Sequence, residues 1–142
     1  MTRRQDGNAQ LRIIATGMTV TGMTVPLEIA ASFRARSRGL LGRDDFEGAL
    51  LLTPASGVHT WRMRFAIDVA YLDRDLTVLS VRTMRPGRLG APHLRARHVL
   101  ESTAGAMARW GLCAGARVEV LSRGAHGRAH EEAHDGDPFQ GL

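Results

Sequence analysis

Residues 67–81, Ile-Asp-Val-Ala-Tyr-Leu-Asp-Arg-Asp-Leu-Thr-Val-Leu-Ser-Val, contain two apolar runs separated by three polar residues. Ile67–Leu72 and Leu76–Val81 each have the length of a strand and are rich in the β-branched and aromatic residues that strands prefer. Asp73-Arg-Asp75 is a short polar connection of the kind that joins antiparallel strands. The stretch therefore predicts a β-hairpin.

The same two-residue periodicity extends outward in both directions from this hairpin. Further strands are predicted at Ile13–Ile14, Val25–Ala30, Ala49–Thr53 (ended by Pro54), His98–Glu101 and Arg117–Leu121. Together with the hairpin, this gives about seven strands with mostly local connections. We expect a β-rich α+β domain: a small twisted, partly closed antiparallel β-barrel with two short helices.

Two short helices complete the pattern. Ser32 is a suitable N-cap for a helix from Phe33 to about Leu41, closed by Gly42. Its arginines are expected to be solvated; they are Arg34, Arg36 and Arg38. Ser102 or Thr103 is expected to cap a second helix through Trp110, with Gly111 in the left-handed position after it.

One segment is duplicated: Thr16–Val20 and Thr21–Val25 both read Thr-Gly-Met-Thr-Val. Ten residues are too few for a repeat protein. A tandem duplication that lengthened a strand or a loop is the simpler interpretation, and it could leave the strand register there weakly specified.

Composition divides the 142 residues into three zones. Residues 1–10 are expected to be a flexible N-terminus, 11–122 a single barrel-like domain and 123–142 a disordered tail with too little apolar content to offset the entropy of ordering. No apolar run is long enough to span a membrane, and no apolar stretch follows the basic residues at the N-terminus. We therefore expect a cytoplasmic protein without a membrane partner.

All 19 basic residues are arginine, and the net charge is +5. This charge permits a basic nucleic-acid-binding barrel as one hypothesis. Its contact residues would be Arg62, Arg64, Arg82, Arg85, Arg88, Arg95 and Arg97. Aromatic residues make up only 5% of the chain and no RNA-binding aromatic motif occurs, so nucleic acid is not the favoured partner.

Residues 58–68, Val-His-Thr-Trp-Arg-Met-Arg-Phe-Ala-Ile-Asp, form the most distinctive segment. In an extended backbone, Trp61, Met63 and Phe65 would make one apolar face and the intervening arginines one basic face. In the structural interpretation, these three apolar residues lie in the hydrophobic core. The functional one puts Trp61 at a pocket mouth, beside His59 and an arginine such as Arg64 that could bind an anionic group.

Two acids interrupt apolar runs: Asp68 within residues 65–72, and Glu101 after Val99-Leu100. An acid in such a setting is rarely buried without a partner, and Arg64 is the obvious partner for Asp68. Two carboxylates in one cleft could instead share general acid and base roles. The sequence does not show whether these two acids meet in space.

Other chemistry is weakly supported. His126, His130 and His134 recur every four residues and could align on a helix to bind a metal, but the glycines among them favour a solvated tail. Cys113 lacks a catalytic signature, and the chain contains neither a nucleophile elbow nor a phosphate-binding glycine loop. We therefore expect no metal, no cofactor and no assigned catalytic residue.

A succession of short blocks carries a family resemblance. The blocks are Arg38-Gly-Leu-Leu-Gly-Arg43, Gly48–Leu52, His59–Asp68 with Val69–Asp73, Val99-Leu-Glu101, Ala104-Gly105, Gly111-Leu112 and Gly115. In this order they resemble the bacterial and archaeal family known as domain of unknown function 192, over residues 24–121. The resemblance implies a compact β-rich, barrel-like domain and no established activity.

Two departures from the family pattern concern the segment before Asp68. His59-Thr-Trp61 is similar to a histidine-bearing branch of the family and differs from its more common aromatic-Trp-Met-Lys-Asn-Thr pattern. Ala66 stands where proline is usual, which removes a constraint on φ. The ligand preference of the more typical members therefore does not transfer to this chain.

Three function hypotheses follow. The leading one is a non-enzymatic accessory domain that binds a small molecule or a protein partner in a cleft formed by His59, Trp61, Arg64, Asp68 and Glu101. The second is a small hydrolase or lyase that uses His59 with Asp68 or Glu101. The third is the nucleic-acid-binding barrel. The sequence leaves the ligand and the oligomeric state open.

Overall fold

A computed structural model describes residues 4–16, 19–40, 42–44 and 46–122 of the chain. One sheet has seven strands in the order β6-β5-β8-β3-β2-β1-β9. In chain order these strands are β1 (Gly7–Thr16), β2 (Thr19–Ala30), β3 (Ala49–Leu52), β5 (Ile67–Leu72), β6 (Val78–Met84), β8 (His98–Thr103) and β9 (Arg117–Ser122). Two-residue strands β4 (Val58–His59) and β7 (Leu89–Gly90) form a separate ribbon. The predicted hairpin is confirmed as β5 and β6, which pair antiparallel.

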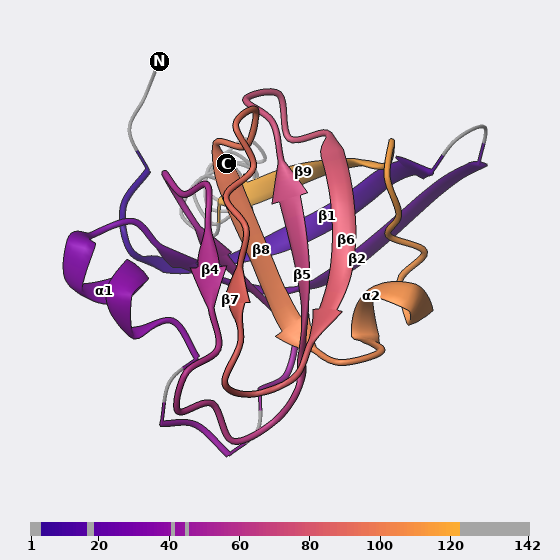
Figure 1. The fold of residues 1–142 in the computed structure, drawn as a ribbon. Coiled ribbons are helices and arrows are strands. Elements are labelled where there is room, and N and C mark those ends of the chain that lie inside the picture. Colours follow the sequence, from indigo (N-terminus) through magenta and orange to yellow (C-terminus); the bar gives the residue numbers. More distant parts are fainter. Residues whose placement is uncertain (1–3, 17–18, 41, 45, 123–142) are drawn as a thin grey trace, which may run out of the picture.

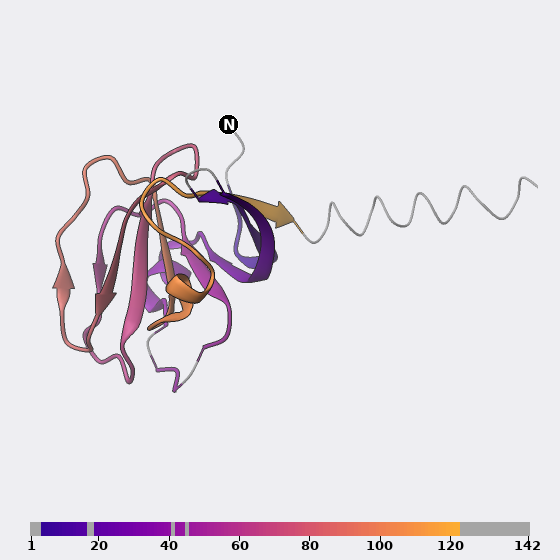
Figure 2. The ribbon, with the colours of Figure 1, turned by 90° about the vertical axis from the view of Figure 1, so that its right-hand side faces the viewer.

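The large sheet curls until its two edge strands approach one another (Figures 1 and 2). Thr77, just before β6, bridges Arg117 of β9, and the amide of Val78 donates to the Ala116 carbonyl at 2.8 Å. This contact partly closes the sheet, as the predicted barrel requires. Neighbouring strands are antiparallel except for β2 and β3, which run parallel.

The β1–β2 hairpin is longer than the sequence pattern predicts. β1 begins at Gly7, within the stretch expected to be a flexible N-terminus, and Asp6 accepts hydrogen bonds from the amides of Ala31 and Ser32. The duplicated pentapeptide falls in this hairpin: its first copy includes the end of β1 and the start of β2, where Thr16 pairs with Thr19, and its second lies in β2. The duplication therefore extends a hairpin. The predicted tail, residues 123–142, lies outside the described residues.

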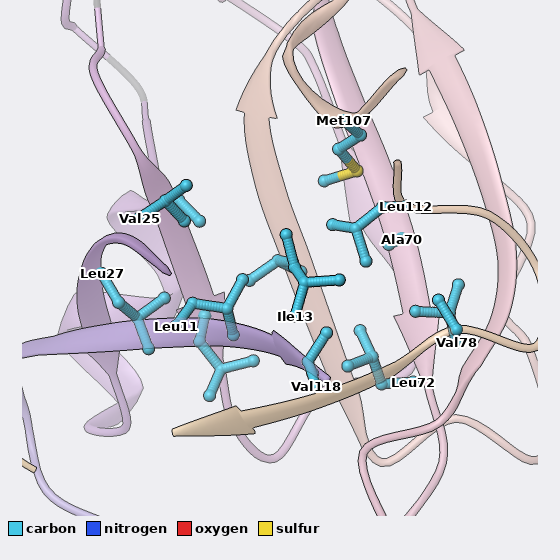
Figure 3. Packing of buried hydrophobic residues seen from close by; sticks show 14 residues of the cluster. Leu11, Ile13, Val25, Leu27, Ala70, Leu72, Val78, Met107, Leu112 and Val118 are labelled. Carbon is cyan, nitrogen blue, oxygen red and sulfur yellow. The ribbon is translucent and has the colours of Figure 1, made fainter. Parts of the chain in front are cut away.

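The sheet has a buried cluster of apolar side chains on each face. One lies inside the curl, where residues of β1, β2 and β9 meet those of β5, β6 and α2 (Ala106–Arg109), as Figure 3 shows for Ile13, Leu72 and Met107. The other lies beneath α1 (Phe33–Arg38) and the β4–β7 ribbon. β3 and β5 are covered on both faces, which explains why they read as unbroken apolar runs.

Both predicted helices are present but shorter. Ser32 caps α1 as predicted, but the helix ends at Gly39 and not at Gly42, because Gly39 takes a left-handed φ of +49°. The expected cap of α2 is wrong as well: β8 continues through Thr103, and Gly105 precedes the helix without a side-chain cap. Gly111 has the predicted left-handed conformation.

Candidate functional site

A small pocket of about 70 Å³ lies between α1, β3, β4 and β8. Part of its wall is apolar and comes from Leu40, Leu52, Val58 and Met63. The polar part includes the side chains of Arg36, His59 and Glu101. Two of the five site residues predicted from sequence, His59 and Glu101, are therefore brought together here.

Glu101 is the buried acid of this pocket. It lies on β8 and is 4% exposed, and no hydrogen bond or ion pair joins its carboxyl to another residue within the described part of the chain. Burial raises the pKa of Glu101 to about 7. Its carboxyl thus belongs to a buried residue, faces the pocket and has no hydrogen-bond partner among the described residues.

Asp68 lies on the opposite face of the sheet from Glu101. In the β5–β8 register, Asp68 pairs with Ser102, and Val69 pairs with Glu101. Directly paired residues point to the same face and successive residues to opposite faces, so the two carboxyls point away from each other. They do not form a shared acid–base site.

The carboxylate of Asp68 accepts three hydrogen bonds that hold parts of the fold together. It accepts hydrogen bonds from the Thr83 hydroxyl at 2.7 Å, the Gly105 amide at 2.9 Å and the Met107 amide at 3.2 Å. Two of these donors belong to the start of α2, so Asp68 supplies from β5 the cap that the helix lacks. The prediction that Arg64 pairs with Asp68 is wrong, because Arg64 is exposed and pairs with Asp44.

His59 and Trp61 form an exposed stack beside the pocket. Their ring centroids are 5.1 Å apart with 28° between the planes, and Trp61 is 52% exposed. Thr60, between them, is completely buried and its hydroxyl accepts a hydrogen bond from the Arg88 amide at 2.8 Å. Arg62 has a φ of +64°, so the chain turns there.

This turn explains why the predicted alternation of residues 61–65 fails. An extended backbone would have buried Trp61, Met63 and Phe65 together, whereas only Met63 is fully buried and Phe65 is partly buried. Trp61 is instead free to flank the pocket. The chain therefore exposes one aromatic residue that the core interpretation assigned to the interior.

Arg36 is the pocket residue that the sequence reasoning missed. It was expected to be solvated, but it is half-buried and donates from Nη1 to the Pro54 carbonyl at 2.9 Å. Its Nε is buried and has no hydrogen-bond partner among the described residues. The block Arg38-Gly-Leu-Leu-Gly-Arg43 was a usable signal, because Gly39 ends α1 and packs beside Glu101.

The remaining candidate groups are dispersed. No cluster of three or more histidine, cysteine, aspartate or glutamate side chains that could hold a metal occurs among the described residues, and Cys113 is exposed. His126, His130 and His134 lie outside those residues. Within the described part of the chain, no helix has the length and apolar character needed to cross a membrane.

The predicted basic residues are all exposed. They are Arg62, Arg64, Arg82, Arg85, Arg88, Arg95 and Arg97. Exposure is the ordinary state of arginine, so it does not by itself indicate a nucleic-acid interface. Nucleic-acid binding stays a prediction.

The sequence matches the family model DUF192, described as an uncharacterized ACR, over residues 16–120. It is 32% identical over 84 residues to a UPF0127 protein of Pyrococcus abyssi, a match that covers 56% of this chain and 72% of the relative. A UPF0127 protein of Pyrococcus horikoshii is 31% identical over 84 residues, covering 56% of this chain and 73% of that protein.

Two crystal structures share the fold. One is a Sinorhizobium meliloti protein provisionally described as a transcription regulator, with a TM-score of 0.64 and 19% identity, covering 84% of this chain and 98% of that one. The other is a Novosphingobium aromaticivorans protein of unknown function, with a TM-score of 0.64 and 19% identity, covering 78% and 83%. At this identity the likeness extends to the fold alone.

Proposed function

Because this chain belongs to DUF192, an uncharacterised family, we propose a function from the chemistry of its own pocket: a non-enzymatic domain that binds a ligand or partner group between α1 and β8. One observation carries the proposal. The Glu101 carboxyl is buried, faces the pocket and lacks a hydrogen-bond partner within the described chain. An unpaired buried carboxyl is unfavourable unless something else pairs with it.

The surroundings of Glu101 suit an entering group. His59, the exposed residue of β4, lines the same pocket, and Trp61 stacks on its ring. An aromatic side chain that is half exposed beside a pocket offers apolar contact to whatever part of a ligand stays outside. Of the five predicted site residues, His59, Trp61 and Glu101 are retained in the proposed site.

Asp68 and Arg64 are left out of it. Asp68 makes its three hydrogen bonds on the other face of the sheet, and Arg64 is exposed and paired with Asp44. A hydrolase or lyase that uses His59 with Asp68 therefore lacks support. For His59 with Glu101, no hydrogen bond joins the two side chains in the described structure, so binding is better supported than catalysis.

A fragment screen on the full chain tests the proposal, with binding followed by NMR chemical shifts. We expect ligands whose affinity falls at least about tenfold in both Glu101→Leu and His59→Ala and stays unchanged in Arg64→Ala, the control outside the pocket. The proposal is refuted if every fragment that binds the wild type binds all three variants equally well.

A further inference from the structure

The β4–β7 ribbon is the middle of a longer two-chain structure, residues 55–62 and 85–97, which we call the arginine ribbon. Its two chains stay hydrogen-bonded beyond β4 and β7, and at one end the amide of Ala55 donates to the carbonyl of Arg97 at 2.9 Å. The arginine ribbon lies in front of the large sheet in Figure 1 and forms the left-hand edge of the molecule in Figure 2. It therefore has an inner face toward the sheet and an outer face toward solvent.

Thr60, which is completely buried, holds the other end of the arginine ribbon together. Its amide donates to the Arg88 carbonyl at 2.7 Å, and its hydroxyl donates to the Arg85 carbonyl at 2.6 Å. Its carbonyl accepts from the amide of Gly87 at 2.7 Å. These hydrogen bonds fix the turn between β6 and β7 beside Trp61, which follows Thr60 in the chain.

His59 and Leu89 lie on the outer face of the arginine ribbon. They pair directly across β4 and β7, so their side chains point to the same side. The next residue, Gly90, faces the sheet, because a Cβ placed on it would lie 2.9 Å from the Tyr71 hydroxyl oxygen. Trp61 stacks on the ring of His59. The outer face thus presents Leu89, which is 69% exposed, beside Trp61, which is 52% exposed.

The outer face also carries unpaired positive charge. The two segments of the arginine ribbon contain no acid, and all their arginines are exposed. These arginines are Arg62, Arg85, Arg88, Arg95 and Arg97. None of them forms an ion pair or a side-chain hydrogen bond within the described part of the chain. An anionic partner can therefore approach without meeting a carboxylate of the arginine ribbon.

Exposed apolar side chains coincide with this charge. Among the described residues, the large apolar side chains that are exposed belong to Met23, Trp61, Leu89 and Leu94, and the last three lie in the arginine ribbon. A partner that matches both features needs anionic groups with an apolar layer beneath them. The surface of an anionic phospholipid bilayer has this structure. Nucleic acid supplies phosphates but no apolar layer that leucine side chains could enter.

We propose that the outer face of the arginine ribbon binds the surface of an anionic phospholipid bilayer. Trp61 and Leu89 enter the headgroup region, and the arginines contact the lipid phosphates. The sequence predicts no membrane partner because it contains no span, but binding at the surface requires none. His59 and Trp61 also border the pocket of the proposed function, so the variants that test membrane binding leave both of them in place.

Co-sedimentation of the full chain with lipid vesicles tests the charge. Vesicles of phosphatidylglycerol should bind the chain at least about tenfold more tightly than vesicles of phosphatidylcholine. The double variant Arg85→Gln/Arg88→Gln should bind phosphatidylglycerol about 25-fold more weakly, at about fivefold for each arginine near the surface. The control is Arg12→Gln/Arg109→Gln, which removes two exposed arginines outside the arginine ribbon and should bind like the wild type. No binding to phosphatidylglycerol, or equal losses in the two double variants, overturns the proposal.

Two further variants test the apolar contact. Leu89→Ser should weaken binding to phosphatidylglycerol vesicles by about tenfold, whereas Met23→Ser, at an exposed apolar residue outside the arginine ribbon, should not. Trp110→Phe leaves Trp61 as the single tryptophan, and brominated phosphatidylglycerol should quench its fluorescence. Unchanged binding of Leu89→Ser, or fluorescence that is not quenched, overturns the proposal.

A single-stranded DNA oligonucleotide separates lipid from nucleic acid as the anionic partner. The oligonucleotide should not displace the chain from phosphatidylglycerol vesicles at equal concentrations of phosphate. Displacement by the oligonucleotide, together with its loss of binding in Arg85→Gln/Arg88→Gln, would assign the arginine ribbon to nucleic acid and overturn the proposal. Glu101→Leu, which removes the carboxyl of the pocket, should bind the vesicles like the wild type, so failure of either proposal leaves the other standing.

Discussion

Replacing Glu101 with glutamine should raise the free energy of unfolding at pH 8 and leave it almost unchanged at pH 4. Burial raises the pKa of Glu101 from 4.5 to about 7 in the folded chain. Between these two values the folded state binds more protons than the unfolded state, so stability falls as pH rises. Glutamine carries no charge at any pH, and the variant should lack this fall.

The size of the effect follows from the two pKa values. The difference between 4.5 and about 7 corresponds to about 3 kcal/mol at about 1.4 kcal/mol per pKa unit. Arg36 and Arg38 line the same pocket, as does the imidazole of His59, and none of them forms an ion pair with Glu101 in the described structure. Above pH 7 the variant should therefore melt roughly 10 °C higher than the wild type.

Urea denaturation and thermal melting between pH 4 and pH 8 measure this difference. Glu119→Gln is the matched control, since Glu119 is an exposed acid on β9 and should show no comparable pH dependence. The reasoning is refuted if Glu101→Gln melts at or below the wild-type temperature at pH 8. That result would mean that the ionised carboxyl has a partner that stabilises its charge.

Three further substitutions test other parts of the account. Asp68→Ala leaves three donors without an acceptor and should destabilise the fold by about 4 kcal/mol; an unchanged urea midpoint would mean that α2 does not need this cap. Arg64→Ala should leave the melting temperature unchanged, because the ion pair that Arg64 forms with Asp44 is exposed. A fall of several degrees would contradict this. Gly48→Ala places a Cβ within 3.0 Å of the Pro26 carbonyl oxygen and should cost about 2 kcal/mol or more. Gly87→Ala, with a similar positive φ and open space around it, separates this clash from backbone strain, and equal losses in the two variants would refute the clash.

The strands were largely predictable because their signal is local. Both β5 boundaries, Ile67 and Leu72, match the prediction: Asp73 ends the apolar run after Leu72, whereas the run already includes Phe65 and Ala66 before Ile67. The β1–β2 hairpin was underestimated because its polar residues form ordinary backbone pairs, and pairing with β9 holds β1 on its other side. The helix ends were missed where a distant residue decides them, as Asp68 does for α2.

The site was predictable in part. His59, Trp61 and Glu101 were selected by residue type and neighbourhood, and they lie together around one pocket or against its lining. Arg36 was not selected, because which face of a six-residue helix becomes buried depends on β8 and the loop at Pro54, both remote in sequence. Periodicity can identify a strand, but it does not identify the element that will cover it.

Asp68 and Glu101 share one sequence pattern, an acid within an apolar run, but they have different surroundings in the fold. Both interrupt such runs and both are nearly fully buried, at 3% and 4% exposure. Strand register alone places them on opposite faces, where Asp68 meets three donors and Glu101 meets none among the described residues. Asp68 therefore contributes to stability, whereas the burial of Glu101 opposes it increasingly as the pH rises above 4.5 and in full above about 7. Because an apolar side chain would fill the position of Glu101 without that penalty, stability does not account for a carboxyl there, and this is the reason for the proposal that the pocket binds a ligand or partner group.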